Sequence, residues 1–224
     1  MTTTPLQPQD RQLLSGNGLA PDTLVGVCRL HFAKGELLCQ TGHSMTHLLV
    51  LLSGRVKISM SDRQGRTLLF CQQDGQGMLG DVELVLEDQD ATTMVEALSA
   101  LVCIGIPMAA NREQMRGSLT FMNRVSEALA AKLARLSRDS SLTILYGLEP
   151  RLCSYIGVAA RDGVFREKWT ELAERLGTSY RHLLRSLDGL CARGVLAREG
   201  RGYRILDPDR LQDLGAGADG YRAP

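Results

Sequence analysis

The sequence predicts an α+β fold in which an antiparallel β-barrel or sandwich, a long helix and a helix-turn-helix with a β-hairpin follow one another. Three observations predict this order: short apolar runs over 24–107, a nearly turn-free stretch over 108–146, and leucine periodicity on both sides of Gly177. The 224 residues suffice for two domains of ordinary size. We expect the ends, 1–23 and 207–224, to form an N-terminal arm and a flexible tail.

The first domain is predicted from candidate strands of 5–7 residues separated by Gly, Asp and Ser. These strands are Val27–Phe32, Glu36–Gln40, His47–Leu52, Arg55–Ser61, Thr67–Gln72, Thr92–Ala97 and Leu101–Ile106. Short strands at regular spacing are typical of an antiparallel barrel or sandwich. Apolar and polar residues alternate from Arg55 to Met60, so we expect one solvated and one buried face on that strand.

A long helix over 108–146 is predicted next, because Gly117 is the only glycine between Gly105 and Gly147. A 4-3 spacing, typical of a coiled-coil seam, relates Met122, Ser126, Leu129, Leu133, Leu136, Ser140 and Thr143. We expect dimerisation through this stripe; the alternative is a stripe that only packs into the protein's own core.

The second domain, over 147–206, is predicted to be a winged helix-turn-helix. Gly147 and Pro150 end the long helix, and another helix follows from Arg151 to Ala160. Thr170 is the expected N-cap of a short helix, and Thr178 or Ser179 is the expected cap of the next one. Their inner faces are Leu172, Ala173 and Leu176 in the first helix, and Leu183, Leu184, Leu187 and Leu190 in the second. Two short helices around the tight turn at Gly177 are the helix-turn-helix layout.

The exposed N-terminal end of the second helix carries side chains that suit DNA. Arginine donates two hydrogen bonds to guanine, and hydroxyl or imidazole groups reach phosphates. The expected contacts are Ser179, Tyr180, Arg181, His182 and Arg185, with Arg201 and Arg204 from a hairpin wing over 195–205 that also carries Arg198. Residues 151–206 hold 11 Lys and Arg against 6 Asp and Glu, whereas residues 1–110 hold 7 against 11. This asymmetry favours DNA binding by the second domain.

Three further segments carry a resemblance to a known family: Gly35–Gly42, His47–Ile58 and Gly80–Leu86. Together with 170–190 they resemble the bacterial catabolite-activator/fumarate-nitrate-regulator (CRP/FNR) family, and Ser179–Arg185 looks closest to its YeiL-like branch. The resemblance covers about 24–206 and implies a jelly-roll barrel like a cyclic-nucleotide-binding domain. It also implies a transcription regulator that binds a palindromic DNA operator as a homodimer and, if it is an activator, contacts RNA polymerase.

The effector site departs from the family pattern. Nucleotide-binding members use a Glu for the ribose and an Arg-Ser pair for the cyclic phosphate, where this chain has Asp81 and Ala91-Thr92. Without a guanidinium a buried phosphate lacks its counter-ion, which argues against cyclic AMP. No cysteine precedes Cys28, which argues against the family's iron–sulfur cluster. The candidate effector-pocket residues are Gly80, Asp81, Val82, Ala91 and Thr92.

How such a pocket would be switched stays open at this point. A small ligand anchored by Asp81, thiol chemistry at one of six cysteines, or no effector at all are the alternatives. Activation and repression are not distinguished, and neither the operator nor its target genes follow from the sequence.

Other classes of function find little support. We find no enzyme motif and no metal-ligand spacing, and we interpret His31, His43 and His47 as surface or loop histidines. A polar N-terminus and the absence of a long apolar run predict a cytoplasmic protein with no membrane partner. The alternative function is a ligand-binding module whose winged helix docks a protein partner rather than DNA.

Overall fold

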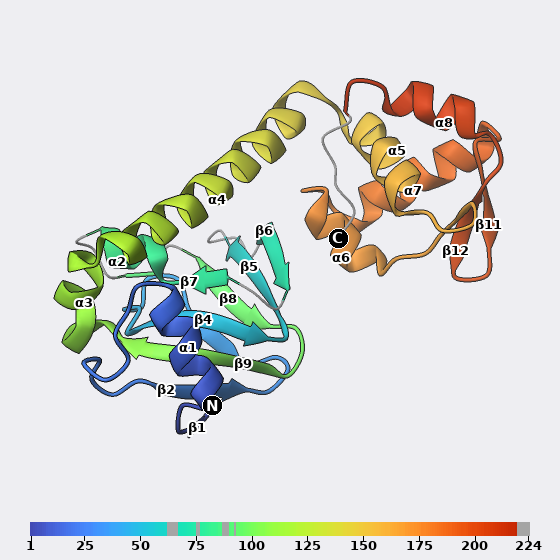
Figure 1. Ribbon diagram of the computed structural model, residues 1–224. Helices are drawn as coiled ribbons and strands as arrows, with labels where there is room; N and C mark the ends of the chain where they lie inside the picture. Colours follow the sequence, from blue (N-terminus) through green and yellow to red (C-terminus); the bar gives the residue numbers. More distant parts are fainter. Residues whose placement is uncertain (62–66, 75–76, 87–89, 92, 219–224) are drawn as a thin grey trace. The chain divides into compact units, whose positions relative to one another are not determined.

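The computed structural model describes residues 1–61, 67–74, 77–86, 90–91 and 93–218 (Figure 1). Two compact units are present, Met1–Leu133 and Ala134–Pro224. The elements of the first unit are β1 (Thr2–Thr4), α1 (Pro8–Gly16), β2 (Cys28–Phe32), β3 (Leu37–Cys39), β4 (His47–Ser53), β5 (Arg55–Ser61), β6 (Thr67–Asp74), β7 (Gly77–Leu79), α2 (Asp81–Val85), β8 (Met94–Ala97), β9 (Leu101–Pro107) and α3 (Met108–Gly117). Helix α4 (Leu119–Leu145) crosses from the first unit into the second. The second unit continues with α5 (Leu148–Ala159), β10 (Val164–Phe165), α6 (Trp169–Arg175), α7 (Tyr180–Ala192), β11 (Leu196–Glu199), β12 (Gly202–Ile205) and α8 (Pro208–Gly215).

The strands of the first unit form two antiparallel sheets that enclose one apolar core. One sheet has the strand order β1-β2-β9-β4-β7 and the other the order β3-β8-β5-β6. Leu48 on β4, Ile104 on β9 and Val56 on β5 are fully buried in the core of this unit. The predicted strands are confirmed in this jelly-roll fold, although Thr92 lies outside the described residues. Strand β7 and helix α2 were not predicted from the sequence.

The predicted alternation along β5 breaks at one point. The β5–β6 pairing shifts register between Ile58 and Ser59, where Ile58 pairs with Cys71 and Ser59 with Leu69, so the extra residue lies on β6. On β5 itself, Ser59 is 1% and Met60 41% exposed, which is the reverse of what the alternation predicts. The clean alternation expected from Arg55 to Met60 is therefore wrong beyond Ile58.

The segment 1–23 is part of the first unit, and its description as a separate arm is wrong. Strand β1 pairs with β2, with Thr3 opposite Leu30, and α1 begins at Pro8. Leu14 and Leu19 are buried in the core of the β-sheets. Burial of these two leucines is the physical reason that the segment folds onto the strands.

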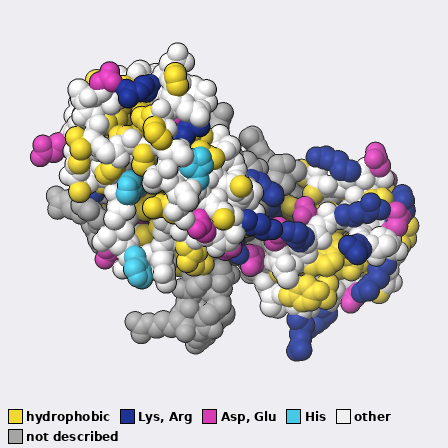
Figure 2. Space-filling model, turned by 90° about the horizontal axis from the view of Figure 1, so that it is seen from below, with side chains coloured by type: hydrophobic (Ala, Val, Ile, Leu, Met, Phe, Trp, Pro, Cys, Tyr) yellow, Lys and Arg dark blue, Asp and Glu magenta, His cyan; other side chains and the backbone are white. Residues whose placement is uncertain are grey.

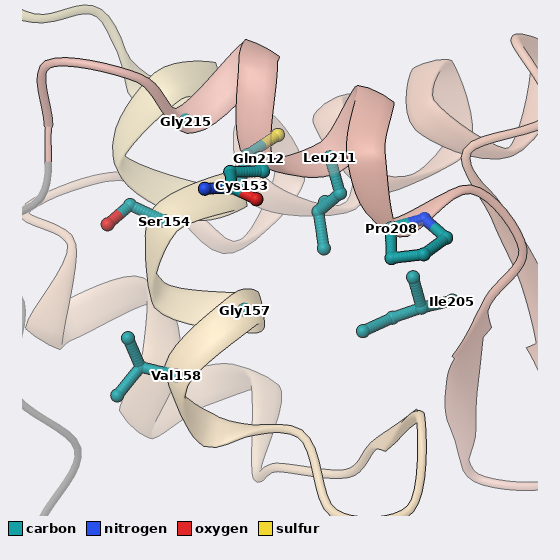
Figure 3. Close-up of a pocket in the computed structure, with 9 residues that line it drawn as sticks. All are labelled: Cys153, Ser154, Gly157, Val158, Ile205, Pro208, Leu211, Gln212 and Gly215. Atoms are coloured by element: carbon teal, nitrogen blue, oxygen red, sulfur yellow. The ribbon is translucent and has the colours of Figure 1, made fainter.

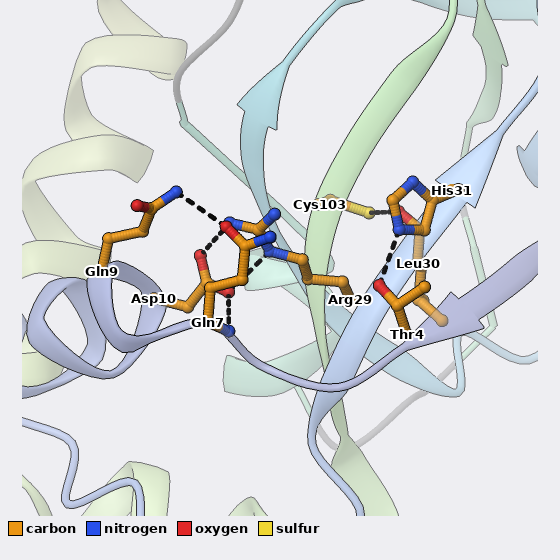
Figure 4. A network of polar contacts seen from close by, with 8 residues as sticks. All are labelled: Thr4, Gln7, Gln9, Asp10, Arg29, Leu30, His31 and Cys103. Atoms are coloured by element: carbon orange, nitrogen blue, oxygen red, sulfur yellow. Dashed lines mark hydrogen bonds and ion pairs between the residues drawn. The ribbon is translucent and has the colours of Figure 1, made fainter.

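A buried ion pair holds α1 on the sheet. Both oxygens of Asp10 accept hydrogen bonds from Arg29 of β2, at 2.6 and 2.7 Å, and one also accepts from the Gln7 amide (Figure 4). Asp10 is 1% exposed. Burial opposes the charged form, but the hydrogen bonds from Arg29 and Gln7 outweigh it, so the pKa of Asp10 lies below its ordinary value.

The stretch 108–146, predicted as a single long helix, is two helices. Ser118 has an extended backbone between α3 and α4. Its hydroxyl accepts a hydrogen bond from the Phe121 amide, as an N-cap does, and donates to the Gly18 carbonyl at 2.6 Å. Because this second partner lies about a hundred residues away in the chain, the break has little local signal.

The second unit has its own core and confirms the predicted winged helix-turn-helix. Strands pair in the order β10-β12-β11, and α5, α6 and α7 pack against them (Figure 1). Helix α6 begins at Trp169 with Lys168 as its N-cap, so the N-cap expected at Thr170 is wrong. The Trp169 ring packs on Phe165 and Tyr203, with centroids 5.8 and 5.4 Å apart, which draws it into the first turn. Pro150 lies in the first turn of α5, where proline is tolerated.

Residues 207–218 are folded, so the flexible tail expected over 207–224 is wrong for this part. Asp207 accepts a hydrogen bond from the Arg210 amide as the N-cap of α8, and Leu211 is buried against α5. A Cβ added at Gly215 would lie 2.8 Å from the Ser154 amide nitrogen, so only glycine allows this close approach. Beside it, α5 and α8 border an apolar cavity of about 370 Å³ (Figure 3).

Exchanging Asp10→Asn is expected to lower the melting temperature at pH 7, by about 2–4 °C for each kcal/mol lost. The loss should shrink as the pH falls through the lowered pKa of Asp10, because the wild-type carboxylate then becomes neutral too. Thermal unfolding at pH 7, 5 and 3 measures this. Asp22→Asn, which removes an exposed partner of Arg11, is the matched control. A destabilisation that did not depend on pH would contradict the ion pair's role.

Candidate DNA interface

Helix α7 has one buried and one exposed face. Leu183, Leu187 and Leu190 are fully buried, and this spacing places them on one side of the helix. Arg181 and Arg185 lie on the opposite side of the helix, and Tyr180 and His182 are also exposed at its N-terminal end. The leucine face therefore sets the direction in which these polar side chains point.

The turn before α7 is fixed by its backbone. Gly177 has φ +59°, a conformation that L side chains rarely adopt, and links α6 to α7. Ser179 is the N-cap of α7, and its hydroxyl accepts a hydrogen bond from the His182 amide at 3.2 Å. Of the two caps that the sequence left open, the structure selects Ser179. Thr178 instead lies with its hydroxyl 3.3 Å from the His182 ring.

The arginines of this region fall into two groups. Within the part of the chain that the structure describes, Arg181, Arg185 and Arg201 have no ion-pair partner. By contrast, Arg204 pairs with Glu199 across the wing hairpin, and Arg198 pairs with Asp188 of α7 at 2.8 Å. The unpaired guanidinium groups are exposed and keep their hydrogen-bond donors for a ligand.

The Arg198–Asp188 pair joins the wing to α7. Strands β11 and β12 meet in a turn at Gly200 and Arg201, so Arg201 lies at the tip. This salt bridge links β11 to α7, so the wing that carries Arg201 is attached to the helix that carries Arg181 and Arg185. On the face shown in Figure 2, Lys and Arg side chains are concentrated on the C-terminal unit. The predicted contact residues are thus brought onto two adjoining elements, α7 and the wing.

Arg151 supports the turn from below and was not identified from the sequence. It is a buried residue of α5, and its Nη1 donates a hydrogen bond to the Leu176 carbonyl at 2.9 Å. Leu176 directly precedes Gly177, so this bond acts on the turn itself. Nη1 also donates to the Thr143 hydroxyl at the end of α4. An arginine within the apolar stretch 148–156 was the available signal.

The described candidate effector-pocket residues are buried or half-buried in the first unit. Gly80 has φ +85°, and a Cβ there would lie 2.8 Å from the Met108 Cε and 2.9 Å from the His47 carbonyl. Asp81 is buried at the start of α2, and Val82 is half-buried beside it. Ala91 is a buried side chain whose backbone pairs with Gly42 and His43. Thr92 lies outside the described residues.

Asp81 already has a cationic partner. Lys132 of α4 places its Nζ 2.7 Å from each carboxylate oxygen and 2.8 Å from the Met78 carbonyl. The side chain of Asp81 is 2% exposed and that of Lys132 is 23% exposed. One of the alternatives left open by the sequence made Asp81 the polar anchor of a small ligand; the structure pairs Asp81 with a lysine that is distant in the sequence.

The stripe along α4 divides into two parts. Met122 and Leu129 are half-buried and pack on the core of their own β-sheets, whereas Ser126 is exposed. Leu133 is 69% and Leu136 36% exposed. Met122 and Leu129 therefore follow the alternative in which the stripe packs into the protein's own core. Leu133 and Leu136 are exposed and remain available to a partner.

Thiol chemistry is disfavoured at four cysteines. Burial raises the pKa of Cys39 to about 11 and those of Cys103 and Cys153 to about 12, and it also raises the pKa of Cys191. The reactive species is the thiolate, which is scarce at neutral pH when the pKa is that high. The side chain of Cys71 lies outside the described residues.

Among the described residues, no three His, Cys, Asp or Glu side chains come close enough to hold a metal ion. No described helix combines the length and apolar character needed to cross a membrane. The histidines predicted to lie on the surface or in loops are found in β2 (His31), in the loop before β4 (His43) and in β4 (His47). His47 is half-buried, and burial lowers its pKa.

A β-jelly roll followed by a helix and a winged helix-turn-helix with unpaired arginines defines a DNA-binding transcription regulator. Two family models match the chain: "Cyclic nucleotide-binding domain" over residues 29–118 and "Crp-like helix-turn-helix domain" over 150–214. The chain belongs to the CRP/FNR family of regulators.

Relatives agree with this assignment. The "Regulatory protein YeiL" of Escherichia coli O157:H7 is 27% identical over 184 residues, which are 82% of this chain and 84% of that protein. A CRP/FNR-family transcriptional regulator from Eubacterium rectale has a similar structure, with TM-score 0.70, 19% identity and coverage of 94% and 95% of the two chains. The c-di-GMP responsive regulator CLP of Xanthomonas campestris gives TM-score 0.68 at 16% identity, covering 80% of this chain and 93% of that one.

Exchanging Ser179→Ala is expected to lower the free energy of unfolding by about 1 kcal/mol, because α7 loses its N-cap acceptor. Urea denaturation followed by circular dichroism measures this. Ser186→Ala is the matched control, since that hydroxyl only donates to the His182 carbonyl within the same helix. Equal effects of the two exchanges would contradict a specific capping role.

Proposed function

We propose that this regulator binds a palindromic DNA operator as a homodimer, reads guanines through Arg181 and Arg185, and does not respond to cyclic AMP. The observation that carries the proposal is the contrast between these exposed, unpaired arginines and the ion-paired Arg198 and Arg204 of the wing. RNA polymerase is the further partner if the protein activates transcription.

Base reading by α7 follows from its exposed end. Arg181 and Arg185 are four residues apart and so lie on one side of the helix, with Tyr180 beside them. In a helix-turn-helix this end enters the major groove, where an arginine can donate two hydrogen bonds to guanine O6 and N7. We assign Ser179, His182 and Arg201 to phosphate contacts beside it, whereas Arg204 must first leave Glu199.

Dimerisation is supported by the exposed leucines of α4. Leu133 and Leu136 follow the coiled-coil spacing. Both side chains are exposed, whereas Phe121 and Val125 on the same helix are buried. Large exposed apolar side chains in one row are costly in water and favour a partner surface. In the family, two-fold-symmetric dimers read half-sites about one helical turn apart.

Independence from cyclic AMP is supported by two positions. Ala91 is buried and apolar where a cyclic phosphate would need a cation. The side chain of Asp81 is 2% exposed and both of its carboxylate oxygens already accept from Lys132, which disfavours its use by a ribose hydroxyl. The c-di-GMP response named for the Xanthomonas regulator suggests nucleotides other than cyclic AMP as additional probes.

The function is tested by selecting duplexes from a random DNA pool with the purified protein at moderate salt. A recovered palindrome with guanines at matching positions of two half-sites is expected. The selection is repeated with reductant, oxidant and cell extract if nothing is enriched. An interaction with a protein partner that salt does not weaken, together with failure to enrich DNA, would favour the protein-docking alternative.

Exchanging Arg185→Ala is expected to relax base preference and to weaken operator binding by about 1–3 kcal/mol. Arg201→Ala should instead weaken all sequences alike and reduce the salt dependence of binding by about one counterion. Repeating the selection and titrating the operator at several salt concentrations separates these effects. Arg116→Ala on α3 is the control, because it lies exposed on the other unit. An unchanged base preference in Arg185→Ala would make Arg185 a phosphate contact only.

Exchanging Leu133→Asp or Leu136→Asp is expected to shift the protein from dimer to monomer, because a carboxylate would enter the apolar seam. Analytical ultracentrifugation measures the mass, and a titration with the palindrome should show a parallel loss of affinity. Ala131→Asp is the matched control, since Ala131 is exposed on the side of α4 away from the stripe. A monomeric wild-type protein would contradict the dimer proposal.

A further inference from the structure

The ammonium group of Lys132 has a hydrogen-bond acceptor for each of its donors. An ammonium group has three donors, and the three acceptors here are the two Asp81 oxygens at 2.7 Å and the Met78 carbonyl at 2.8 Å. These acceptors come from the end of β7 and the start of α2, while Lys132 belongs to α4. The pair therefore connects α4 to the β7–α2 segment through an ammonium group whose three donors are all used.

Neighbouring groups hold Asp81 in place. Arg112 of α3 donates hydrogen bonds to the Glu83, Leu84 and Leu86 carbonyls at the C-terminal end of α2. At the other end, Gly80 is packed against Met108 and His47 so closely that a Cβ would not fit. With both ends of α2 fixed, Asp81 presents its carboxylate to α4 in one position.

Apolar packing places Lys132 beside that carboxylate. Phe121 and Val125 of α4 are buried in the β-sheet core, and Leu129 packs against it. An intramolecular partner acts at an effective concentration that a free ligand must exceed, and it loses no translational freedom on binding. A soluble molecule that used Asp81 as its anchor would have to reach a carboxylate that is 2% exposed and compete with the ammonium group already bound there.

We propose that Lys132 takes the place of a soluble effector at this site, so that the protein binds its operator without any small molecule. The ion pair keeps the first half of α4 fixed on the β-sheets at all times, and regulation then follows the amount of protein. This inference rests on the proposed function, because it requires an operator that the protein binds.

The test compares the wild type with Lys132→Met and with the double variant Lys132→Met, Asp81→Asn. Native mass spectrometry first checks that the purified wild type carries no small molecule. The wild type is then expected to bind the selected palindrome in full, and added cyclic AMP should change its Kd by less than about twofold, because an effector acts only through differential affinity for two states. Both variants are expected to lose about tenfold or more in operator affinity.

Thermal stability separates anchoring of α4 from a general loss of folding. Lys132→Met leaves a buried carboxylate without its cation and should lower the melting temperature, whereas the double variant removes both charges and should recover most of it. Operator affinity should stay low in both, and amide hydrogen exchange over residues 125–136 should be faster in both. Arg124→Met is the matched control, because it breaks an exposed ion pair with Glu127 on the same helix.

Three results would overturn the inference. A wild type that binds the palindrome only after cell extract or a nucleotide is added contradicts it and leaves the proposed function intact. Variants whose operator affinity simply follows their melting temperature, or whose hydrogen exchange matches the wild type, show that the pair only stabilises the fold. A wild type that enriches no duplex under any condition contradicts the proposed function, and the inference with it.

Discussion

The packing of α4 into the β-sheet core is the constraint on which the rest of the first unit depends. Phe121 and Val125 are fully buried, so the start of α4 cannot move without opening the core. A buried aromatic or branched side chain of this kind contributes about 1.5–3 kcal/mol relative to an exposed one. Because one face of α4 is committed in this way, Lys132 and the exposed Leu133 have fixed and different directions, one toward Asp81 and the other toward solvent.

In the second unit the equivalent constraint is the leucine face of α7. Leu183, Leu187 and Leu190 are buried together with Tyr155 and Phe165, and this burial leaves only one direction for Arg181 and Arg185. The turn at Gly177 is then held from the other side by the buried Arg151. An apolar core and one buried guanidinium thus decide which polar side chains can meet a ligand.

Much of this could be predicted because the decisive signals are local. The turn glycine and the leucine spacing of 172–190 define the helix-turn-helix within about twenty residues of sequence, and short apolar runs define the strands. Helices α1 and α8 escaped prediction because each is short and polar, and each is held by a few leucines such as Leu14 and Leu211. The cap at Ser118 and the partner of Asp81 depend on residues distant in the chain, for which periodicity carries no information.

The charge asymmetry between the two halves of the sequence favoured DNA binding by the second domain, and the structure shows which of its arginines have a carboxylate partner. Part of the positive charge of the second unit is neutralised locally, since Arg198 binds Asp188 and Arg204 binds Glu199. These pairs are exposed and contribute little to stability, but they place a carboxylate beside each of the two guanidinium groups. Within the described residues, Arg181 and Arg185 have no ion-pair partner, and they stand on the face that the leucines of α7 turn outward. Under the proposed function, sequence selectivity depends on which arginines the fold leaves unpaired, because an arginine that is already bound to a carboxylate must lose that partner before it can read a base.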